Sequence, residues 1–375
     1  MKVLKRVLKW ITGAILVVLL LVFVGVFVAY WRSTNDCDKK NAAAPANPMK
    51  AIVRCDYGLS NLKLEDIEKP VPADDQILVK VHAVSVNPYD WHFVEGTPYV
   101  MRAMGVGLRK PKDIRIGVDF AGTVEAVGKN VTQYKPGDDV FGGRDGAFAQ
   151  YLCRRAVGAV ALKPAGLTFE QAASINIAGI TALQGVRDKG KVQPGQKVLI
   201  NGASGGVGTF AVQLAKNFGA EVTGVCSGRN TELVQSLGAD HVIDYTKEDF
   251  TKGTERYDVL LDNVGNRSLS ECRRVLTPNG TYVLIGGGGA NEQGFLGGLA
   301  KALDAAVYSK FVSQKMGMMM ANPSTNDLTL LADMMQSGKI KPVIDRTYKS
   351  LSEVPEAIRY LEEGHARGKV VITVE

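Results

Sequence analysis

Three glycines, Gly202, Gly205 and Gly208, follow directly after a short apolar run at 197–201. The run has the length of a buried strand, and the amphipathic stretch through Asn217 predicts a helix after the glycines. Glycine adopts backbone angles that a Cβ disfavours and lets backbone approach a ligand closely. The N–H groups of a first helical turn attract an anion. This pattern predicts a diphosphate-binding loop of a dinucleotide site. The expected contact residues are Gly202, Ala203, Ser204, Gly205, Gly206, Val207 and Gly208.

The end of the next predicted strand, 222–226, indicates which dinucleotide binds. A carboxylate at this position would hydrogen-bond the adenosine ribose of NAD. Here the strand runs into Ser227 and Arg229, with no carboxylate beside them. A serine donor and an arginine cation suit a 2′-phosphate. We therefore predict NADPH. The alternative is that Arg229 is a solvated residue at a helix start and Ser227 is its cap.

The elements that must position these residues follow from the spacing of apolar side chains. After Leu167, short apolar runs alternate with helical stretches, which predicts a parallel sheet with helices on both faces. The predicted strands are 197–201, 222–226, 241–245, 257–262, 281–286 and about 314–319. Before Leu167 the chain is β-rich, with strands at 77–84 and 122–128. A helix at 327–338 and strands at 343–348 and 369–374 complete the chain.

Composition is that of a globular protein with two domains and an appendage. The chain has 375 residues, of which 46% are hydrophobic and 22% charged, and a formal net charge of +7. Residues 1–48 hold seven basic and two acidic residues, whereas the remainder holds 38 basic and 36 acidic ones. The excess charge is thus concentrated at the N-terminus, and a nucleic-acid partner is not expected.

The five cysteines are scattered and odd in number, and no pair has CxxC spacing. This spacing predicts neither a zinc ribbon nor a disulfide framework. We expect reduced thiols, as in a cytosolic protein.

The stretch from Trp10 to Trp31 is uncharged and almost wholly apolar, and four basic residues precede it. It is long enough to cross a bilayer, with aromatic residues at both ends. A cleaved signal peptide is the alternative, but its apolar region would be shorter and would precede a small-residue cleavage site. We therefore expect a membrane anchor and tether at 1–48, with the helix at about 10–31. The basic flank slightly favours a cytoplasmic N-terminus, which would place the rest of the chain outside the cytoplasm. A domain that consumes a nicotinamide cofactor would have no supply there, so we expect a cytoplasmic main domain.

Five stretches carry a resemblance to a known family. They are Gly117–Gly122, Gly146–Tyr151, Ala178–Ala182, the glycine loop and Gly364–Val371. With the order of elements, they resemble the medium-chain dehydrogenase/reductase superfamily, in its zinc-independent quinone oxidoreductase branch, which includes bacterial NAD(P)-dependent alcohol dehydrogenase-like proteins. The resemblance implies an α/β protein with a GroES-like catalytic domain at 49–170 plus 323–375. A doubly wound six-stranded Rossmann domain is implied at 171–322.

The resemblance also implies site residues outside the glycine loop. Tyr245 matches a tyrosine that lines the phosphate pocket, Asn263 and Gly265 would border the nicotinamide half, and Thr181 would lie at the cofactor edge, with helix packing as its alternative. A glycine-rich loop at 286–289 would also border the nicotinamide or be an ordinary surface loop. The implied catalytic residues are Asn87, which would position substrate or nicotinamide, and Tyr89, a possible donor of a hydrogen bond or proton. Asp90, His92 and Tyr99 would lie nearby, and aromatic lining of the cleft is the alternative for Tyr89 and His92.

No metal is expected in this site. Zinc-dependent members use a Cys, a His-Glu pair and a further Cys to bind the ion. Asn87 stands at the first position and Val118-Asp119 at the His-Glu pair. Valine cannot bind a metal, and asparagine is a poor zinc ligand.

Without a metal, hydride transfer suits acceptors whose negative charge is delocalised. We therefore expect an NADPH-dependent reductase of a quinone or an α,β-unsaturated carbonyl. The alternatives are an alcohol dehydrogenase or aldehyde reductase, and a membrane-tethered NADPH sensor without turnover. The segment 99–112, with two methionines and several basic residues, would form an apolar mouth for lipophilic acceptors or an ordinary loop. A homodimer is left open.

Overall fold

The computed structural model describes residues 10, 17, 20–21, 24–25, 27–28, 30–35, 37, 44–143, 146–286 and 298–375. Much of the predicted membrane helix at 10–31 lies outside these residues. Those that are described are helical, and their large apolar side chains are 41–80% exposed. Within the described part of the chain, no helix combines the length and apolarity that a bilayer crossing needs.

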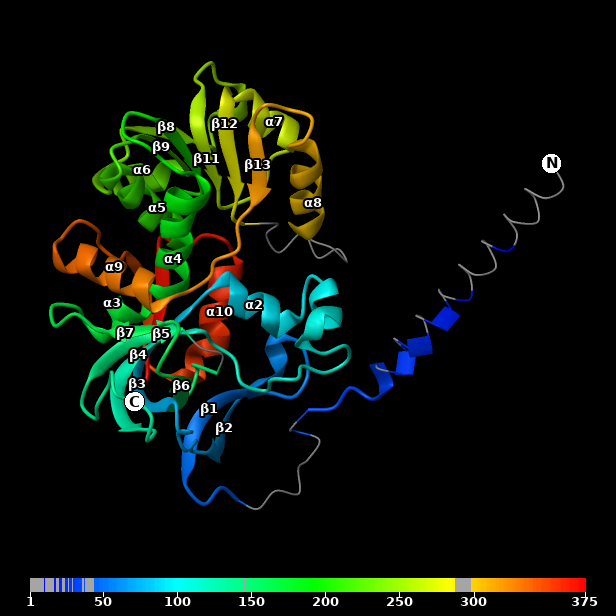
Figure 1. The fold of residues 1–375 in the computed structure, drawn as a ribbon, viewed down its shortest axis with the longest axis vertical. Helices are drawn as coiled ribbons and strands as arrows, with labels where there is room; N and C mark the ends of the chain where they lie inside the picture. The colour runs from blue at the N-terminus through cyan, green and yellow to red at the C-terminus, as the bar shows by residue number, and fades with distance from the viewer. Residues whose placement is uncertain are drawn as a thin grey trace.

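A six-stranded parallel sheet forms the upper half of the molecule in Figure 1. Its strands are β8 (Lys197–Asn201), β9 (Glu221–Cys226), β10 (His241–Asp244), β11 (Tyr257–Asp262), β12 (Leu276–Leu284) and β13 (Lys315–Met318). They lie in the order β10-β9-β8-β11-β12-β13. This is the doubly wound order of a dinucleotide-binding sheet, so the predicted Rossmann fold is confirmed. Its central strands are buried on both faces, which explains their continuous apolar runs.

Helices pack along both sides of this sheet, as the alternating pattern predicts. They are α4 (Asn176–Gln184), α5 (Gly206–Asn217), α6 (Thr231–Ser236), α7 (Leu269–Arg274) and α8 (Gly298–Tyr308). Helix α5 buries Phe210, Val212 and Leu214, which belong to the largest apolar cluster of the chain. The glycine loop therefore begins a helix that is held firmly against the sheet.

The lower half contains a seven-stranded mixed sheet, which confirms the predicted β-rich region. Its strands are β3 (Gln76–Val86), β4 (Asp119–Val127), β5 (Asp139–Gly143), β6 (Tyr151–Arg155), β7 (Val160–Leu162), β14 (Ile344–Tyr348) and β15 (Lys369–Thr373). A separate pair is formed by β1 (Pro48–Arg54) and β2 (Leu62–Glu68). The helices of this half are α2 (Pro88–Glu95), α3 (Phe169–Ala173), α9 (Thr325–Gln336) and α10 (Val354–Glu362).

The register of this sheet brings the end of the chain to the predicted site. Val370 of β15 pairs with Val86 of β3 in an antiparallel register. The residue after Val86 is Asn87, which caps α2, and the residue before Val370 is Lys369. Residues that lie 282 positions apart in the sequence thus become neighbours through one strand pairing.

Element ends differ from the predicted ones where capping or pairing decides them. Helix α9 begins at Thr325 rather than 327, because the Ser324 hydroxyl caps it by accepting from the Asp327 N–H. Strand β12 begins at Leu276 rather than 281, because Leu276 pairs with Tyr257 on the neighbouring strand. Such ends depend on single hydrogen bonds, which apolar periodicity does not report.

The expectation that all cysteines are reduced is wrong for one pair. Cys37 and Cys55 form a disulfide, while Cys153, Cys226 and Cys272 are free thiols. Spacing could not reveal this pair, because its partners lie on different sides of β1. The disulfide joins the chain leaving the apolar N-terminal stretch to the end of that strand.

Candidate active site

The glycine loop follows β8 and begins α5, in the arrangement that a diphosphate site requires. Gly202 has a φ of +78°, a conformation that L side chains rarely adopt. A Cβ on Gly208 would lie 2.1 Å from the Gly202 carbonyl oxygen, so this close approach requires glycine. Helix α5 starts at Gly206 with Gly205 in extended conformation as its cap. These residues fit a dinucleotide, because they form a strand-to-helix turn at a helix N-terminus, where anions bind.

The residues after β9 lie beside this loop. Asn230 donates to the Ser204 hydroxyl at 3.0 Å and to the Ser227 hydroxyl at 3.2 Å. The Arg229 guanidinium is exposed and donates to the His365 carbonyl oxygen at 3.2 Å. Asn230, which sequence reasoning missed, thus connects the glycine loop to the predicted 2′-phosphate position. Ser227 and Arg229 remain predictions as cofactor contacts.

A carboxylate does stand near this position, although not on β9. Asp244 ends β10, and its oxygen lies so close to Gly228 that a Cβ there would be 2.5 Å from it. The Thr246 hydroxyl and N–H donate to Asp244 at 2.7 and 3.1 Å. These hydrogen bonds, with one from the Gly228 N–H, hold the pKa of Asp244 below its usual range. Its oxygens are thereby occupied by local donors. Tyr245, the next residue, is 52% exposed.

The loop after β11 is held by one buried carboxylate. Asp262 accepts from the backbone N–H groups of Val264 and Gly265 and from the Asn201 amide, which ends β8. Asn263 donates to the Asn201 carbonyl oxygen at 3.0 Å. This places the loop with Asn263 and Gly265 at the carboxyl edge of the sheet, where ligands bind in such folds. Thr181 is buried within α4. Of the predicted loop 286–289, residues 287–289 lie outside the described residues.

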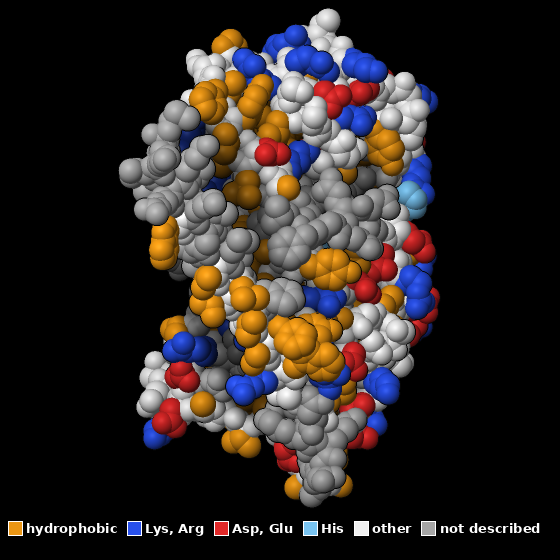
Figure 2. Space-filling model, turned by 90° about the vertical axis from the view of Figure 1, so that its right-hand side faces the viewer, with side chains coloured by type: hydrophobic (Ala, Val, Ile, Leu, Met, Phe, Trp, Pro, Cys, Tyr) orange, Lys and Arg blue, Asp and Glu red, His pale blue; other side chains and the backbone are white. Residues whose placement is uncertain are grey.

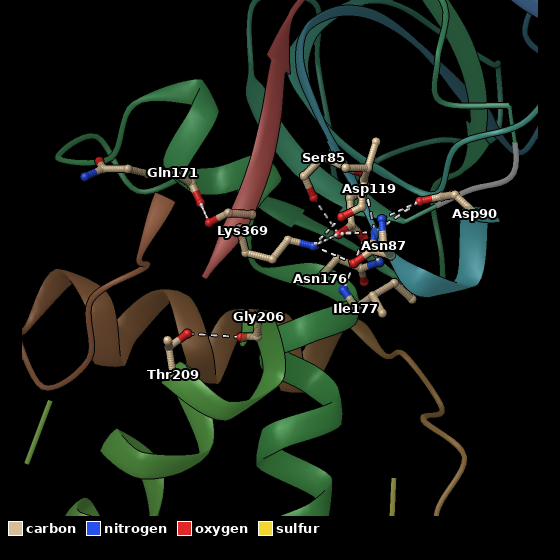
Figure 3. Close-up of polar contacts among 12 residues, drawn as sticks. Ser85, Asn87, Asp90, Asp119, Gln171, Asn176, Ile177, Gly206, Thr209 and Lys369 are labelled. Atoms are coloured by element: carbon tan, nitrogen blue, oxygen red, sulfur yellow. Dashed lines mark hydrogen bonds and ion pairs between the residues drawn. The ribbon is translucent and has the colours of Figure 1, made fainter. Parts of the chain in front are cut away.

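Asn87 lies in a buried polar cluster between the two halves (Figure 3). It is 2% exposed, and its amide makes contacts on both sides. The Lys369 ammonium donates to Asn87 Oδ1, and Asn87 Nδ2 donates to Asp119 at 3.0 Å. Because these partners fix the orientation of the amide, Asn87 is a rigid component of the site.

Asp119 is the centre of this cluster. Its carboxylate accepts from the Ser85 hydroxyl at 2.9 Å, from the Asn176 amide at 2.9 Å and from the Ile177 N–H at 3.1 Å. Lys369 forms an ion pair with it at 3.3 Å, and both residues are almost fully buried. The stem of Lys369 crosses the glycine loop, since a Cβ on Gly206 would lie 3.1 Å from Lys369 Cδ. The cluster and the cofactor cradle are therefore adjacent. Lys369, Asp119, Ser85 and Asn176 were not identified from the sequence as site residues.

Asp90 is a second buried carboxyl group in the cluster. Its Oδ2 accepts from the Asn87 N–H at 2.8 Å, whereas among the described residues no group hydrogen-bonds its Oδ1. Burial, reinforced by the negative charge of Asp119, raises the pKa of Asp90 to about 8. One ammonium and two carboxyl groups share this space, so a neutral Asp90 leaves the cluster without net charge.

Helix α2, which Asn87 caps, also carries aromatic side chains. Tyr89 is 37% exposed, and its ring stacks on Phe93 with centroids 4.3 Å apart. Burial lowers the pKa of His92, whose Nδ1 lies 3.0 Å from the Thr97 carbonyl oxygen. The roles predicted for Tyr89 and Asn87 in catalysis remain predictions.

The residues at the zinc positions do not fit a zinc ion. Val118 is an apolar buried residue, and the Asn87 oxygen already accepts a hydrogen bond from Lys369 Nζ. Among the described residues, no group of three His, Cys, Asp or Glu side chains is arranged to hold a metal. The Asn87 oxygen, the one oxygen at the first zinc position, thus already has Lys369 as its partner.

These features place the chain in a class of protein. A sheet of dinucleotide-binding topology, whose glycine loop lies against a rigid polar cluster from a second domain, is the arrangement of two-domain oxidoreductases that use a nicotinamide nucleotide.

Comparison with known proteins assigns the family. Residues 73–170 match the family described as alcohol dehydrogenase GroES-like domain, and residues 237–372 match zinc-binding dehydrogenase. The mitochondrial NAD(P)H oxidoreductase RTN4IP1 of Bos taurus is 35% identical, covering 92% of this chain and 96% of that protein. The trans-enoyl reductase pgmF of Aspergillus terreus is 33% identical, covering 84% of this chain and 92% of that protein. The structure of the quinone oxidoreductase from Coxiella burnetii superposes with a TM-score of 0.77 at 31% identity, covering 88% of this chain and all of that one. The chain therefore belongs to the medium-chain dehydrogenase/reductase superfamily, among quinone oxidoreductase-like and enoyl reductase-like members.

Proposed function

We propose that the chain is an NADPH-dependent, zinc-independent reductase of quinones or α,β-unsaturated carbonyls. The observation that carries this proposal is the buried contact of Lys369 with Asn87 and Asp119 beside the glycine loop. Because this contact occupies Asn87 and no zinc ligand stands at Val118, hydride transfer without a metal favours acceptors whose negative charge is delocalised over the oxidation of simple alcohols. The names of the quinone and enoyl reductases that the chain resembles support the same choice.

One set of residues would hold the cofactor and another would orient the acceptor. The loop from Gly202 to Gly208 would hold the diphosphate, and Ser227 with Arg229 would hold the 2′-phosphate. When bound, NADPH supplies a hydride from its nicotinamide ring. The phenol of Tyr89, an exposed residue two positions after Asn87, would donate a hydrogen bond to the acceptor's oxygen.

The experiment uses the purified full chain in detergent and follows NADPH oxidation with a quinone, an enone, an aldehyde and no acceptor. The proposal expects turnover with the first two acceptors, a preference over NADH, and no loss of activity with a chelator. Turnover limited to aldehydes or alcohols would support the dehydrogenase alternative. Tight NADPH binding without turnover would support the sensor alternative, and loss of activity with chelator would refute zinc independence.

We also propose that residues 10–31 tether the enzyme to a membrane, on the apolar length of this stretch. The cytoplasmic placement of the catalytic domain remains a prediction, based on where the nicotinamide cofactor is available. The Cys37–Cys55 disulfide favours an oxidising compartment instead. Extraction of cell membranes with carbonate tests the tether. Labelling with a membrane-impermeant maleimide, before and after reduction, tests the side: protection in intact cells supports the cytoplasm.

A further inference from the structure

The segment 99–112, which follows α2, combines exposed apolar and basic side chains. Met104 is 74% exposed and Tyr99 48% exposed. The segment contains four basic residues and no acidic one, and Arg109 and Lys112 are exposed. Hydrophobic and basic side chains gather at mid-height on the face in Figure 2, on the side from which the N-terminal stretch leaves in Figure 1. Such a surface attracts anionic phospholipid headgroups.

The chain that leaves the apolar N-terminal stretch lies directly against this segment. The Arg109 guanidinium lies 5.4 Å from the centre of the Trp31 ring. Two residues further on, the Ser33 hydroxyl accepts from the Lys110 N–H at 3.3 Å. Segment 99–112 is therefore fixed next to the last residue of the apolar stretch.

A second set of contacts fastens the same chain to the catalytic half. The Asn35 amide donates to the Cys55 carbonyl oxygen at 2.7 Å, and Cys37 is bonded to Cys55. Cys37 also packs against the small apolar cluster around Met49 and Ala149. We call the Asn35 contact and the Cys37–Cys55 bond the clamp. The clamp therefore limits how far the catalytic half can move relative to the apolar stretch.

We propose that segment 99–112 binds the surface of an anionic phospholipid bilayer and that the clamp holds it there. The inference rests on the proposed membrane tether. A tryptophan at the end of a membrane helix sits at headgroup level. Because Arg109 contacts Trp31, the segment lies at the same level, where its basic residues meet lipid phosphates and its apolar ones meet the acyl boundary.

This orientation has a consequence for substrate access. The segment begins four residues after α2, whose cap is Asn87, and its far end leads into β4, which starts at Asp119. In the sequence it therefore connects two elements that carry residues of the site. With the segment on the bilayer, the proposal expects acceptors dissolved in the membrane to be preferred over water-soluble ones.

Hydrogen exchange measured by mass spectrometry on the full chain in nanodiscs tests the proposal. Discs containing phosphatidylglycerol are compared with discs of phosphatidylcholine alone. We expect amides of 99–112 to exchange roughly tenfold more slowly in the anionic discs. The variant Arg109→Gln/Lys110→Gln/Lys112→Gln is expected to lower the segment's affinity for that surface on the order of 100-fold and abolish the difference. The matched control replaces three exposed lysines elsewhere: Lys135→Gln/Lys247→Gln/Lys349→Gln.

The clamp is tested separately with Cys37→Ser/Cys55→Ser. This variant keeps the apolar stretch, so it should still enter nanodiscs while its segment 99–112 loses protection. The thermal unfolding midpoint shows whether it folds, and the charge variant provides the test if it does not. Equal protection in both lipids, or an effect of the control lysines equal to that of Arg109, Lys110 and Lys112, overturns the proposal. If the parent protein does not enter nanodiscs, the membrane tether is absent and the proposal, which rests on it, is overturned. Absence of turnover leaves these readouts intact and bears only on the proposed function.

Discussion

Replacing Asp90 with asparagine should stabilise the protein at neutral and alkaline pH. The Asp90 carboxyl is 1% exposed and lies in the cluster that also buries Asp119 and Lys369. Asparagine has the same shape and cannot ionise. Its oxygen can accept from the Asn87 N–H as Asp90 Oδ2 does at 2.8 Å, and its amide group takes the place of Oδ1, which no described residue hydrogen-bonds.

The magnitude follows from the two pKa values of this group. In the folded protein the pKa of Asp90 is raised from its ordinary 3.8 to about 8, first by burial and then by the charge of Asp119. A raised folded value means that stability is fully present below pH 4 and is lost as pH rises toward 8. At pH 7 the loss is up to about 4 kcal/mol at 1.36 kcal/mol per pH unit. Asp90→Asn removes this loss and should flatten the pH dependence.

The assay follows urea unfolding through Trp91, which is 8% exposed and neighbours Asp90 on α2. Because the chain has only two other tryptophans, Trp10→Phe/Trp31→Phe leaves Trp91 as the single reporter. Unfolding midpoints are measured from pH 5 to pH 8.5. Asp327→Asn is a control whose effect on stability should be opposite to that of Asp90→Asn. Hydrogen bonds from Arg187 hold the pKa of Asp327 low despite burial, so this change should destabilise the protein.

One outcome would refute the reasoning. If the midpoints of Asp90→Asn and the parent protein fall in parallel between pH 5 and pH 8, Asp90 carries no proton that the folded state retains. A variant less stable than the parent at pH 8 would show that the asparagine amide does not fit the cluster.

Three further predictions concern the cofactor cradle and the cluster. Gly208→Ala should abolish NADPH binding measured by fluorescence titration, because the new Cβ would lie 2.1 Å from a carbonyl oxygen. Arg229→Ala should weaken NADPH binding on the order of tenfold and NADH binding far less, with the exposed Arg256→Ala as its control; equal losses would contradict 2′-phosphate recognition. Lys369→Met should lower the free energy of unfolding by about 3–5 kcal/mol, because Asp119 stays buried without its cation. Rescue of Lys369→Met by Asp119→Asn in the same background would confirm that the charge is the cause.

The parts of the fold that depend on local pattern were predictable. The strand at 197–201, the glycines after it and the alternation that follows all lie within a single supersecondary unit, where apolar period and turn chemistry are sufficient. The six-stranded sheet followed from the same signal.

The parts that depend on distant pairings were not. Lys369 reaches Asn87 only because β15 pairs with β3. Asp244 approaches Gly228 because β10 lies beside β9, so a search limited to the end of β9 could not find it. The Cys37–Cys55 bond likewise depends on where the N-terminal chain crosses the domain. Contacts between residues so far apart in the chain produce no pattern of apolar spacing, so a single sequence does not predict them.

The passage of Lys369 over Gly206 limits how this protein can be recombined with its relatives. A chimera that imports a nucleotide-binding half at 171–322 would keep β15 and its lysine from this chain. An imported residue larger than glycine at position 206 would require that stem to shift by a few tenths of an ångström, since a Cβ alone comes within 3.1 Å of Cδ. Residues 206 and 369 should therefore be exchanged together, although they lie in halves that look like independent modules.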